Sequence, residues 1–187
     1  AALEVFSQNG FRGSTLDQIA EGAGLSKPNL LYYFPSKEAI HAALIDGLLK
    51  VWLAPLRALD PAGDPLTEIL GYIQRKAQLS RNYPRESRLF ANEILQGAPR
   101  VQEAFISDLK PLVDAKAQVI ADWMAAGRIA TLPPHHLIFS IWATTQHYAD
   151  FDVQVRAVLA EEPFPQAEHF LLTLFRRALT PDPSAAF

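Results

Sequence analysis

The chain has 187 residues, of which 49% are hydrophobic, with a formal net charge of −3 and an isoelectric point near 5.9. This composition is typical of a globular protein with a buried core and excludes a disordered chain. The absence of cysteine excludes disulfides, thiolate metal sites and cysteine nucleophiles, and it fits a reducing cytoplasm. No apolar run approaches the roughly 20 residues that a membrane helix needs, so we expect a soluble, cytoplasmic protein.

Helical patterns begin at the first residue of the chain. Apolar positions recur at helical spacing in "AALEVFSQNG" and stop at Gly10, a residue that tolerates the left-handed conformation of helix ends. The chain opens at Ala1 without Met and already inside this pattern, so we expect part of the natural N-terminus to be missing. Ser14 or Thr15 then caps a short second helix, and Ser26 caps a third.

Proline and small polar residues separate the helices of the remaining chain. Ser36 begins a long fourth helix that is bent or ended near Pro55. Further apolar-striped helices are predicted at 65–82, 84–97, 99–127 with a kink at Pro111, 135–151 and 165–179. Because alternating strand patterns are absent, the sequence predicts an all-α fold of about nine helices. We expect a three-helix DNA-binding module at residues 1–40 and a ligand-binding and dimerisation bundle at residues 41–180.

The second and third helices, joined by a glycine-containing turn, have the spacing of a helix-turn-helix. The second helix of such a motif can enter the major groove of DNA. Ser26 and Lys27 at its start can meet phosphates, and the carboxamide of Asn29 can pair with a base edge. The phenol of Tyr33 and the ammonium of Lys37 can each hold a further phosphate.

The charge of this module argues against DNA binding. Residues 1–50 contain the cations Arg12, Lys27, Lys37 and Lys50 against five acidic side chains, which is a weak electrostatic footprint for nucleic acid. A basic arm ahead of Ala1 would restore it. The competing interpretation is a plain helical hairpin whose tyrosines lie at the rim of the core.

The same segment resembles the TetR family of repressors. The family pattern runs from Phe-x-x-x-Gly-(Tyr or Phe) through Thr, Ile-Ala and Ala-Gly to Tyr-x-Phe-x-x-Lys-Glu. The matching residues are Phe6, Gly10, Phe11, Thr15, Ile19, Ala20, Ala23, Gly24, Tyr32, Phe34, Lys37 and Glu38. Later stretches such as "SRLFANEILQGAP" and "HLIFSIWATTQHYADF" are similar to a pyrimidine-responsive branch of the family, and the likeness fades in residues 152–170.

This resemblance implies a dimer of all-α subunits that binds a palindromic operator in double-stranded DNA. It also implies release of the operator when uracil or thymine occupies the C-terminal bundle, with no cofactor besides this effector. A co-repressed or activating protein, and a different small effector, stay open. The residues predicted to contact DNA are Thr15, Ser26, Lys27, Asn29, Leu30, Tyr32, Tyr33 and Lys37.

Polar residues among apolar ones indicate the effector pocket. The indole of Trp52 could cover a flat ring, and the carboxamide of Gln146 offers an acceptor beside a donor, as a pyrimidine imide requires. Tyr72, Glu93 and Tyr148 are further candidates. The competing interpretation is that Trp52 belongs to the core and that Gln146 caps a carbonyl. The resemblance favours the ligand role for both.

The last two long helices are apolar over more than one face, which on a single subunit leaves an apolar stripe. Two-fold pairing of these helices would give a four-helix interface, and its symmetry matches a palindromic operator. The residues predicted for this interface are Ile141, His147, Phe170, Leu171, Leu174 and Phe175.

Two other classes of protein compete with a regulator. An enzyme is disfavoured because the sequence has no phosphate loop, no nucleophile elbow and no metal-ligand spacing on one helix. His135 and His136 are adjacent and face different ways on a helix, so we expect no metal site. An architectural DNA-bending protein would bind no effector, which the placement of Trp52 and Gln146 argues against.

Overall fold

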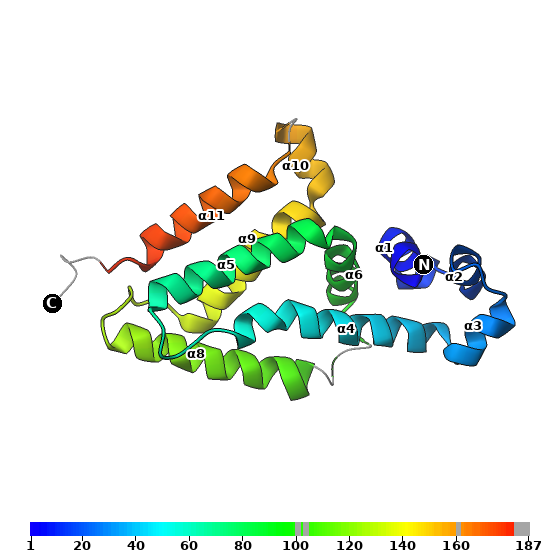
Figure 1. Cartoon of the computed structure of the whole chain (residues 1–187), viewed down its shortest axis with the longest axis horizontal. Coiled ribbons are helices and arrows are strands. Elements are labelled where there is room, and N and C mark those ends of the chain that lie inside the picture. The colour runs from blue at the N-terminus through cyan, green and yellow to red at the C-terminus, as the bar shows by residue number, and fades with distance from the viewer. Residues whose placement is uncertain (100–101, 103–104, 160–161, 182–187) are drawn as a thin grey trace.

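A computed structural model describes residues 1–99, 102, 105–159 and 162–181 of the chain. Within these residues the chain forms ten α-helices and one short π-helix, and it forms no strand (Figure 1). The all-α prediction is confirmed. The sequence predicts about nine helices, and the additional one is α10 (Asp152–Leu159). This helix buries one side chain, Val155, so it carries no apolar stripe that a sequence pattern could detect.

Helices α1 (Ala2–Gly13), α2 (Leu16–Gly22) and α3 (Lys27–Tyr33) lie together at one end of the molecule (Figure 1). The backbone of α1 is interrupted at Gly10, where φ is 66° and ψ is 175°, so the predicted helix end is a break after which the helix resumes. Side chains from these helices and from the start of the next one form a shared core, with Phe6, Phe11, Ile19, Leu30 and Ile40 buried in it.

Helix α4 (Lys37–Arg57) runs from this three-helix module along the rest of the molecule (Figure 1). It continues two residues beyond Pro55, because a proline so close to the helix end disrupts little of the hydrogen-bond ladder. Among the described helices, α4 is long and apolar enough to cross a membrane, but half of that apolar window is buried inside the protein. Its apolar residues are therefore those of a core helix.

The remaining helices form a bundle. Its members are α5 (Pro65–Asn82), α6 (Pro84–Leu95), α8 (Lys110–Ala125), α9 (Pro134–Asp150) and α11 (Phe164–Leu179). Helix α5 packs against both α9 and α11, while α9 also contacts α6 and α8. Each of these helices has a proline in its first turn, as the sequence predicts, because a proline at that position loses no hydrogen bond.

The predicted long helix from Pro99 differs in the structure. Its first turns fall partly on residues 100–101 and 103–104, which lie outside the described residues. A π-helix covers Phe105–Leu109, and α8 then has Pro111 in its first turn. The predicted kink is thus a boundary between two kinds of helix.

Three residues predicted for the dimer interface lie in the core of the chain itself. Ile141 is 1% exposed, Leu171 2% and Phe175 5%, all within the cluster that joins α5, α8, α9 and α11. The interface prediction is wrong for these residues because α9 and α11 use their most apolar sides to pack on α5. Phe170 and Leu174, on another side of α11, are 56% and 42% exposed and stay available to a partner.

Candidate functional site

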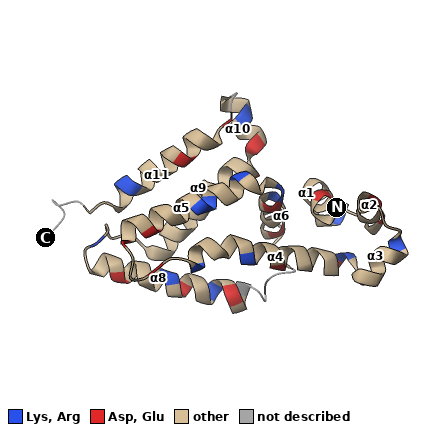
Figure 2. Ribbon diagram, in the orientation of Figure 1, with Lys and Arg blue, Asp and Glu red and all other residues tan. Residues whose placement is uncertain are grey.

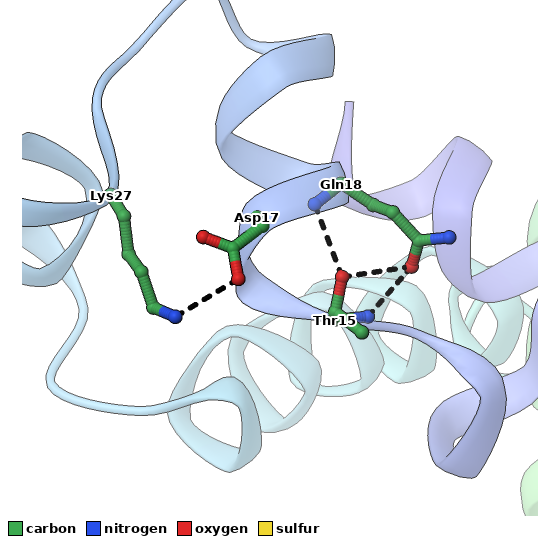
Figure 3. Close-up of polar contacts among 4 residues, drawn as sticks. All are labelled: Thr15, Asp17, Gln18 and Lys27. Carbon is green, nitrogen blue, oxygen red and sulfur yellow. Dashed lines mark hydrogen bonds and ion pairs between the residues drawn. The ribbon is translucent and has the colours of Figure 1, made fainter.

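Local capping fixes the geometry of the helix-turn-helix. The Thr15 hydroxyl accepts a hydrogen bond from the Gln18 amide, and the Gln18 side chain accepts one from the Thr15 backbone, which completes a capping box (Figure 3). The Ser26 hydroxyl caps α3 in the same manner by accepting a bond from the backbone amide of Asn29. The hydroxyls of Thr15 and Ser26 therefore stabilise the starts of α2 and α3. The side chain of Asn29 is exposed.

The outer face of α3 presents two tyrosines to solvent. Tyr32 is 85% exposed and Tyr33 is 68% exposed, and their rings meet edge to face at 5.4 Å between centroids. Aromatic side chains this exposed contribute little to the core, so the interpretation of these tyrosines as rim residues of a hairpin does not explain them. Their roles in DNA contact stay predictions.

The DNA-binding module carries little free positive charge in the structure, as the sequence predicts. Lys27 forms an ion pair with Asp17 at 2.9 Å across the two helices of the motif (Figure 3), and Lys50 pairs with Asp46 at 2.8 Å. Lys and Arg are sparse on α1 to α3 and mixed with acidic side chains (Figure 2). An incoming phosphate must therefore compete with Asp17 for Lys27.

Two residues predicted to contact DNA have structural roles in the three-helix module. Leu30 is 5% exposed and belongs to the core of the three-helix module, so the DNA-contact prediction is wrong for it. The Lys37 ammonium donates to the backbone carbonyls of Phe11 at 2.9 Å and Ser14 at 2.7 Å, and it lies 4.5 Å from the centre of the Phe11 ring. Lys37 thus ties α4 to the end of α1, and its role as a phosphate contact stays a prediction.

Replacing Lys37 by methionine is expected to lower the free energy of unfolding by about 1–3 kcal/mol, because two carbonyl oxygens lose their donor. Chemical denaturation of the two proteins measures this difference. The matched control is Lys50→Met, which removes an exposed ammonium and leaves the core intact. Equal stability of Lys37→Met and the parent would show that these two hydrogen bonds do not stabilise the fold.

A cluster of buried polar side chains lies where α4 meets α5. Lys76 is 2% exposed, Ser80 is fully buried and Trp52 is 5% exposed. The Lys76 nitrogen lies 5.3 Å from the centre of the Trp52 ring. Within the described part of the chain, neither Nε1 of Trp52 nor Oγ of Ser80 has a hydrogen-bond partner. Buried polar groups are rarely left unpaired, which marks this cluster as a candidate ligand site.

Asp150 on α9 supplies the opposite charge. Ser87 on α6 donates a hydrogen bond to its carboxylate. Burial raises the pKa of Asp150, and the Ser87 hydrogen bond and the charge of Lys76 oppose that rise. Burial likewise lowers the pKa of Lys76 to about 7, against the raising effect of Asp150. Helices α4, α5, α6 and α9 therefore contribute to one polar region. The pKa of its lysine is lowered to about 7 by burial.

Gln146 shares a helix face with Asp150. Trp142, Gln146 and Asp150 follow one another at four-residue spacing on α9, which places them on one face of the helix. Nε1 of Trp142 donates to the Tyr72 hydroxyl at 2.6 Å, so Tyr72 is a hydrogen-bonded core residue, and its role as an effector contact stays a prediction. Gln146 and Asp150 also line a groove of about 830 Å³ between α6 and α9.

The two remaining effector candidates lie elsewhere. Glu93 is 2% exposed, and its carboxylate is 3.8 Å from Nε2 of His41, itself buried edge-on against the rings of Phe6 and Phe11. Glu93 thus belongs to the contact between α6 and the three-helix module, and its effector role stays a prediction. Tyr148 lines a separate cavity of about 430 Å³, and its effector role also stays a prediction.

The sequence interpretation missed Lys76, Ser80 and Asp150. A signal for the first two is present, because Tyr72, Lys76 and Ser80 continue the apolar phase of α5 at four-residue spacing. Arg75 precedes Lys76 directly, and two adjacent basic residues are typical of a solvent-exposed helix face. The pattern therefore did not indicate that Lys76 is buried. Asp150 ends its helix, and nothing in the local pattern indicates that it is half-buried.

The exposed apolar residues of α9 and α11 are fewer than predicted. Phe170 and Leu174 on α11 and Phe139 on α9 are each more than 40% exposed. His147 is exposed and stacks on Phe151 at 5.1 Å, beside the groove that Gln146 lines, so its interface assignment stays a prediction.

Comparisons with known proteins cover both parts of the chain. Residues 1–44 match the family model for bacterial regulatory proteins of the tetR family, and residues 45–182 match the model for the C-terminal region of YcdC-like proteins. The HTH-type transcriptional regulator RutR of Escherichia coli strain K12 is 54% identical over 158 residues, which cover 84% of this chain and 74% of RutR.

Solved structures share the fold at low identity. The ketosteroid transcriptional regulator KstR2 of Mycobacterium tuberculosis aligns with a TM-score of 0.73 and 21% identity, over 97% of this chain and 94% of KstR2. AibR, solved in complex with isovaleryl coenzyme A and operator DNA, aligns with a TM-score of 0.69 and 15% identity, over 92% of each chain.

Proposed function

The chain belongs to the TetR family of transcriptional regulators, and we propose that it is a repressor which a pyrimidine such as uracil or thymine releases from DNA. Its relatives are regulators and not enzymes, so the chain regulates transcription. In this proposal residues 1–40 bind one half of a palindromic operator, and residues 41–180 bind the effector and pair with a second copy.

The exposed face of α3 supports the DNA-binding part of the proposal. Asn29 and Tyr33 project from a capped helix whose core side is anchored by Leu30, so the outer face is presented rigidly. In this geometry Asn29 reads a base edge and the tyrosines hold the phosphate backbone. AibR combines operator DNA with a small effector on a similar fold, which makes the same combination a reasonable proposal for this chain.

The observation that carries the effector proposal is the buried polar region around Lys76. It contains hydrogen-bond donors without partners in the described part of the chain, together with an aromatic face at Trp52. A pyrimidine has a flat ring for the indole and polar edges for the donors. Gln146 supplies a carboxamide that matches the imide edge of uracil or thymine.

Two helices connect the effector region with the DNA-binding module. Helix α4 carries Trp52 in the effector region and His41 at the module, eleven residues or about 16 Å apart. Helix α6 carries Ser87 beside Asp150 and Glu93 beside His41. A ligand that moves either helix would shift α1 and with it α3. Effector binding would thereby change the fraction of molecules in the conformation that binds the operator.

Fluorescence anisotropy with a labelled operator tests the proposal. A palindromic site is first selected from genomic fragments, and its affinity is measured with and without saturating uracil. We expect uracil to weaken operator binding by about 5- to 150-fold, the range of a typical allosteric coupling. Tight operator binding that uracil and thymine leave unchanged would refute the pyrimidine effector while the DNA-binding function stands.

The groove between α6 and α9 favours a second candidate effector. Its volume of about 830 Å³ and its apolar lining, with Phe90, Ile94, Leu95 and Phe151, suit a ligand much larger than one pyrimidine. Release of the operator by an apolar compound, and not by uracil, would favour this alternative.

A further inference from the structure

A second cavity, of about 430 Å³, lies at one corner of the bundle. The end of α5, the start of α6, the end of α9 and helix α10 meet there (Figure 1). Ligand pockets commonly have volumes of about 300–1,000 Å³, so this cavity has room for a small organic molecule. Trp52, Lys76, Ser80 and Gln146 do not line it, so it is separate from the proposed effector region.

Three arginines from three different helices line this cavity. Arg81 lies at the end of α5, Arg88 on α6 and Arg156 on α10, and Tyr148 on α9 adds a phenol. Within the described residues, neither Arg81 nor Arg88 forms an ion pair, and the Tyr148 hydroxyl makes no hydrogen bond. A guanidinium group can only donate hydrogen bonds. The cavity therefore offers donors and positive charge that these parts of the protein leave unused.

Two carboxylates also line the cavity, and both are bound to Arg156. Its Nε donates to Asp152 at 2.6 Å, and its Nη2 lies 3.4 Å from Glu162. The charge of Arg88 acts on Asp150, which does not belong to the lining and accepts a hydrogen bond from α6. The lining thus carries three guanidinium groups against two carboxylates. An anion that binds there gains more attraction than repulsion.

From this arrangement we propose that the cavity binds a small organic phosphate monoester, as a second ligand site beside the one for the proposed effector. A phosphate monoester has a charge of about −1.5 to −2 at pH 7 and three acceptor oxygens. Arg81 and Arg88 supply guanidinium forks, which match phosphate oxygens in geometry, and Tyr148 supplies a third donor. A carboxylate has one charge and two oxygens, so it would leave part of this donor set unused.

The remaining wall suits the organic part of such a ligand. Phe164 lines the cavity together with Tyr148, and the centres of their rings are 6.1 Å apart. Pro84 and Ala149 also contribute apolar surface. A ring or short carbon chain attached to the phosphate can therefore be removed from water while the phosphate meets the arginines.

Calorimetry with three aromatic anions tests this site. Phenyl phosphate, phenyl sulfate and benzoate share one ring and differ in charge and in the number of acceptor oxygens. At about pH 7.5, where the phosphate monoester is close to doubly charged, the parent protein is expected to bind phenyl phosphate saturably. Its affinity for phenyl sulfate and for benzoate is expected to be about 10-fold lower.

Substitutions of the unpaired donors locate the binding site. Arg81→Gln and Arg88→Gln are each expected to weaken phenyl phosphate binding by about 10-fold, because a hydrogen bond to a charged group is lost. Tyr148→Phe removes a neutral donor and is expected to have a smaller effect, of about 3-fold. Arg177→Gln changes an exposed arginine of α11 outside the cavity, so it is the control and should bind like the parent.

A gain of affinity keeps the test independent of folding defects. Glu162→Gln removes a negative charge from the lining and releases Nη2 of Arg156 for the ligand. It is expected to tighten phenyl phosphate binding by about 2- to 5-fold. A misfolded variant would bind more weakly, so a gain can only come from the changed charge of the cavity.

The outcomes do not depend on whether uracil releases the operator. Weaker binding by both arginine variants together with tighter binding by Glu162→Gln would support the phosphate site. If the parent does not bind phenyl phosphate, or if Arg81→Gln and Arg88→Gln bind it as tightly as the parent, the proposed site is wrong. Tighter binding of benzoate than of phenyl phosphate would overturn the phosphate assignment in favour of a carboxylate ligand.

Discussion

Raising the pH from 7 to 10 is expected to stabilise the parent protein relative to Lys76→Met. Burial lowers the pKa of Lys76 from 10.5 to about 7, so between these values the unfolded chain binds a proton that the folded chain does not. Stability therefore rises with pH in this window. The cost of the buried charge is fully present below about pH 7 and absent above about pH 10.5. The gain is at most about 1.4 kcal/mol per pH unit.

Denaturant unfolding of both proteins at several pH values measures this difference. Other lysines and tyrosines titrate in the same window, but they are common to both proteins and cancel in the comparison. The exposed-lysine variant Lys110→Met should follow the parent at every pH. A stability difference between the parent and Lys76→Met that is constant from pH 7 to 10 would show that Lys76 is not the buried, weakly basic group described above.

The double substitution Phe170→Glu with Leu174→Glu is expected to convert the proposed dimer to a monomer and to abolish operator binding. Both side chains are exposed on one side of α11, next to the buried positions that hold this helix on α5. Two carboxylates at the centre of an apolar interface would be desolvated without a partner, which costs more than a typical subunit contact provides. Each half-site alone then binds too weakly for a stable complex.

Sedimentation and operator titration of this variant measure both effects. Val51→Glu is the matched control, because Val51 is 46% exposed on α4 and outside the proposed interface. A variant that stays dimeric with Phe170→Glu and Leu174→Glu in place would assign dimerisation to a different face.

Much of the fold could be predicted from the sequence because local signals and packing agree in it. Proline in first turns and the capping side chains of Thr15 and Ser26 mark helix starts without reference to the rest of the molecule. Helix α10 and the π-helix at Phe105–Leu109 lack such signals, because their conformation depends on the neighbours that they join. The structure also places the end of α4 beyond Pro55, where position in the last turn outweighs the usual effect of proline.

The candidate sites were less predictable because the sequence does not show which way a polar residue faces. Lys37 matches the family pattern, and its ammonium is bound to two backbone carbonyls of its own chain. Tyr72 is polar and buried as expected, but Trp142, distant in sequence, satisfies its hydroxyl. Lys76 resembles a surface lysine until the packing of α4 on α5 buries it. Each of these outcomes is decided by contacts between helices far apart in the chain.

A crystal structure of the protein with uracil tests the central claim most directly. The account predicts electron density for the ring against the Trp52 indole, with one carbonyl oxygen within hydrogen-bond distance of the Lys76 ammonium and the Gln146 carboxamide at the other edge. Uracil bound in the apolar groove between α6 and α9, with Lys76 and Ser80 untouched, would contradict it.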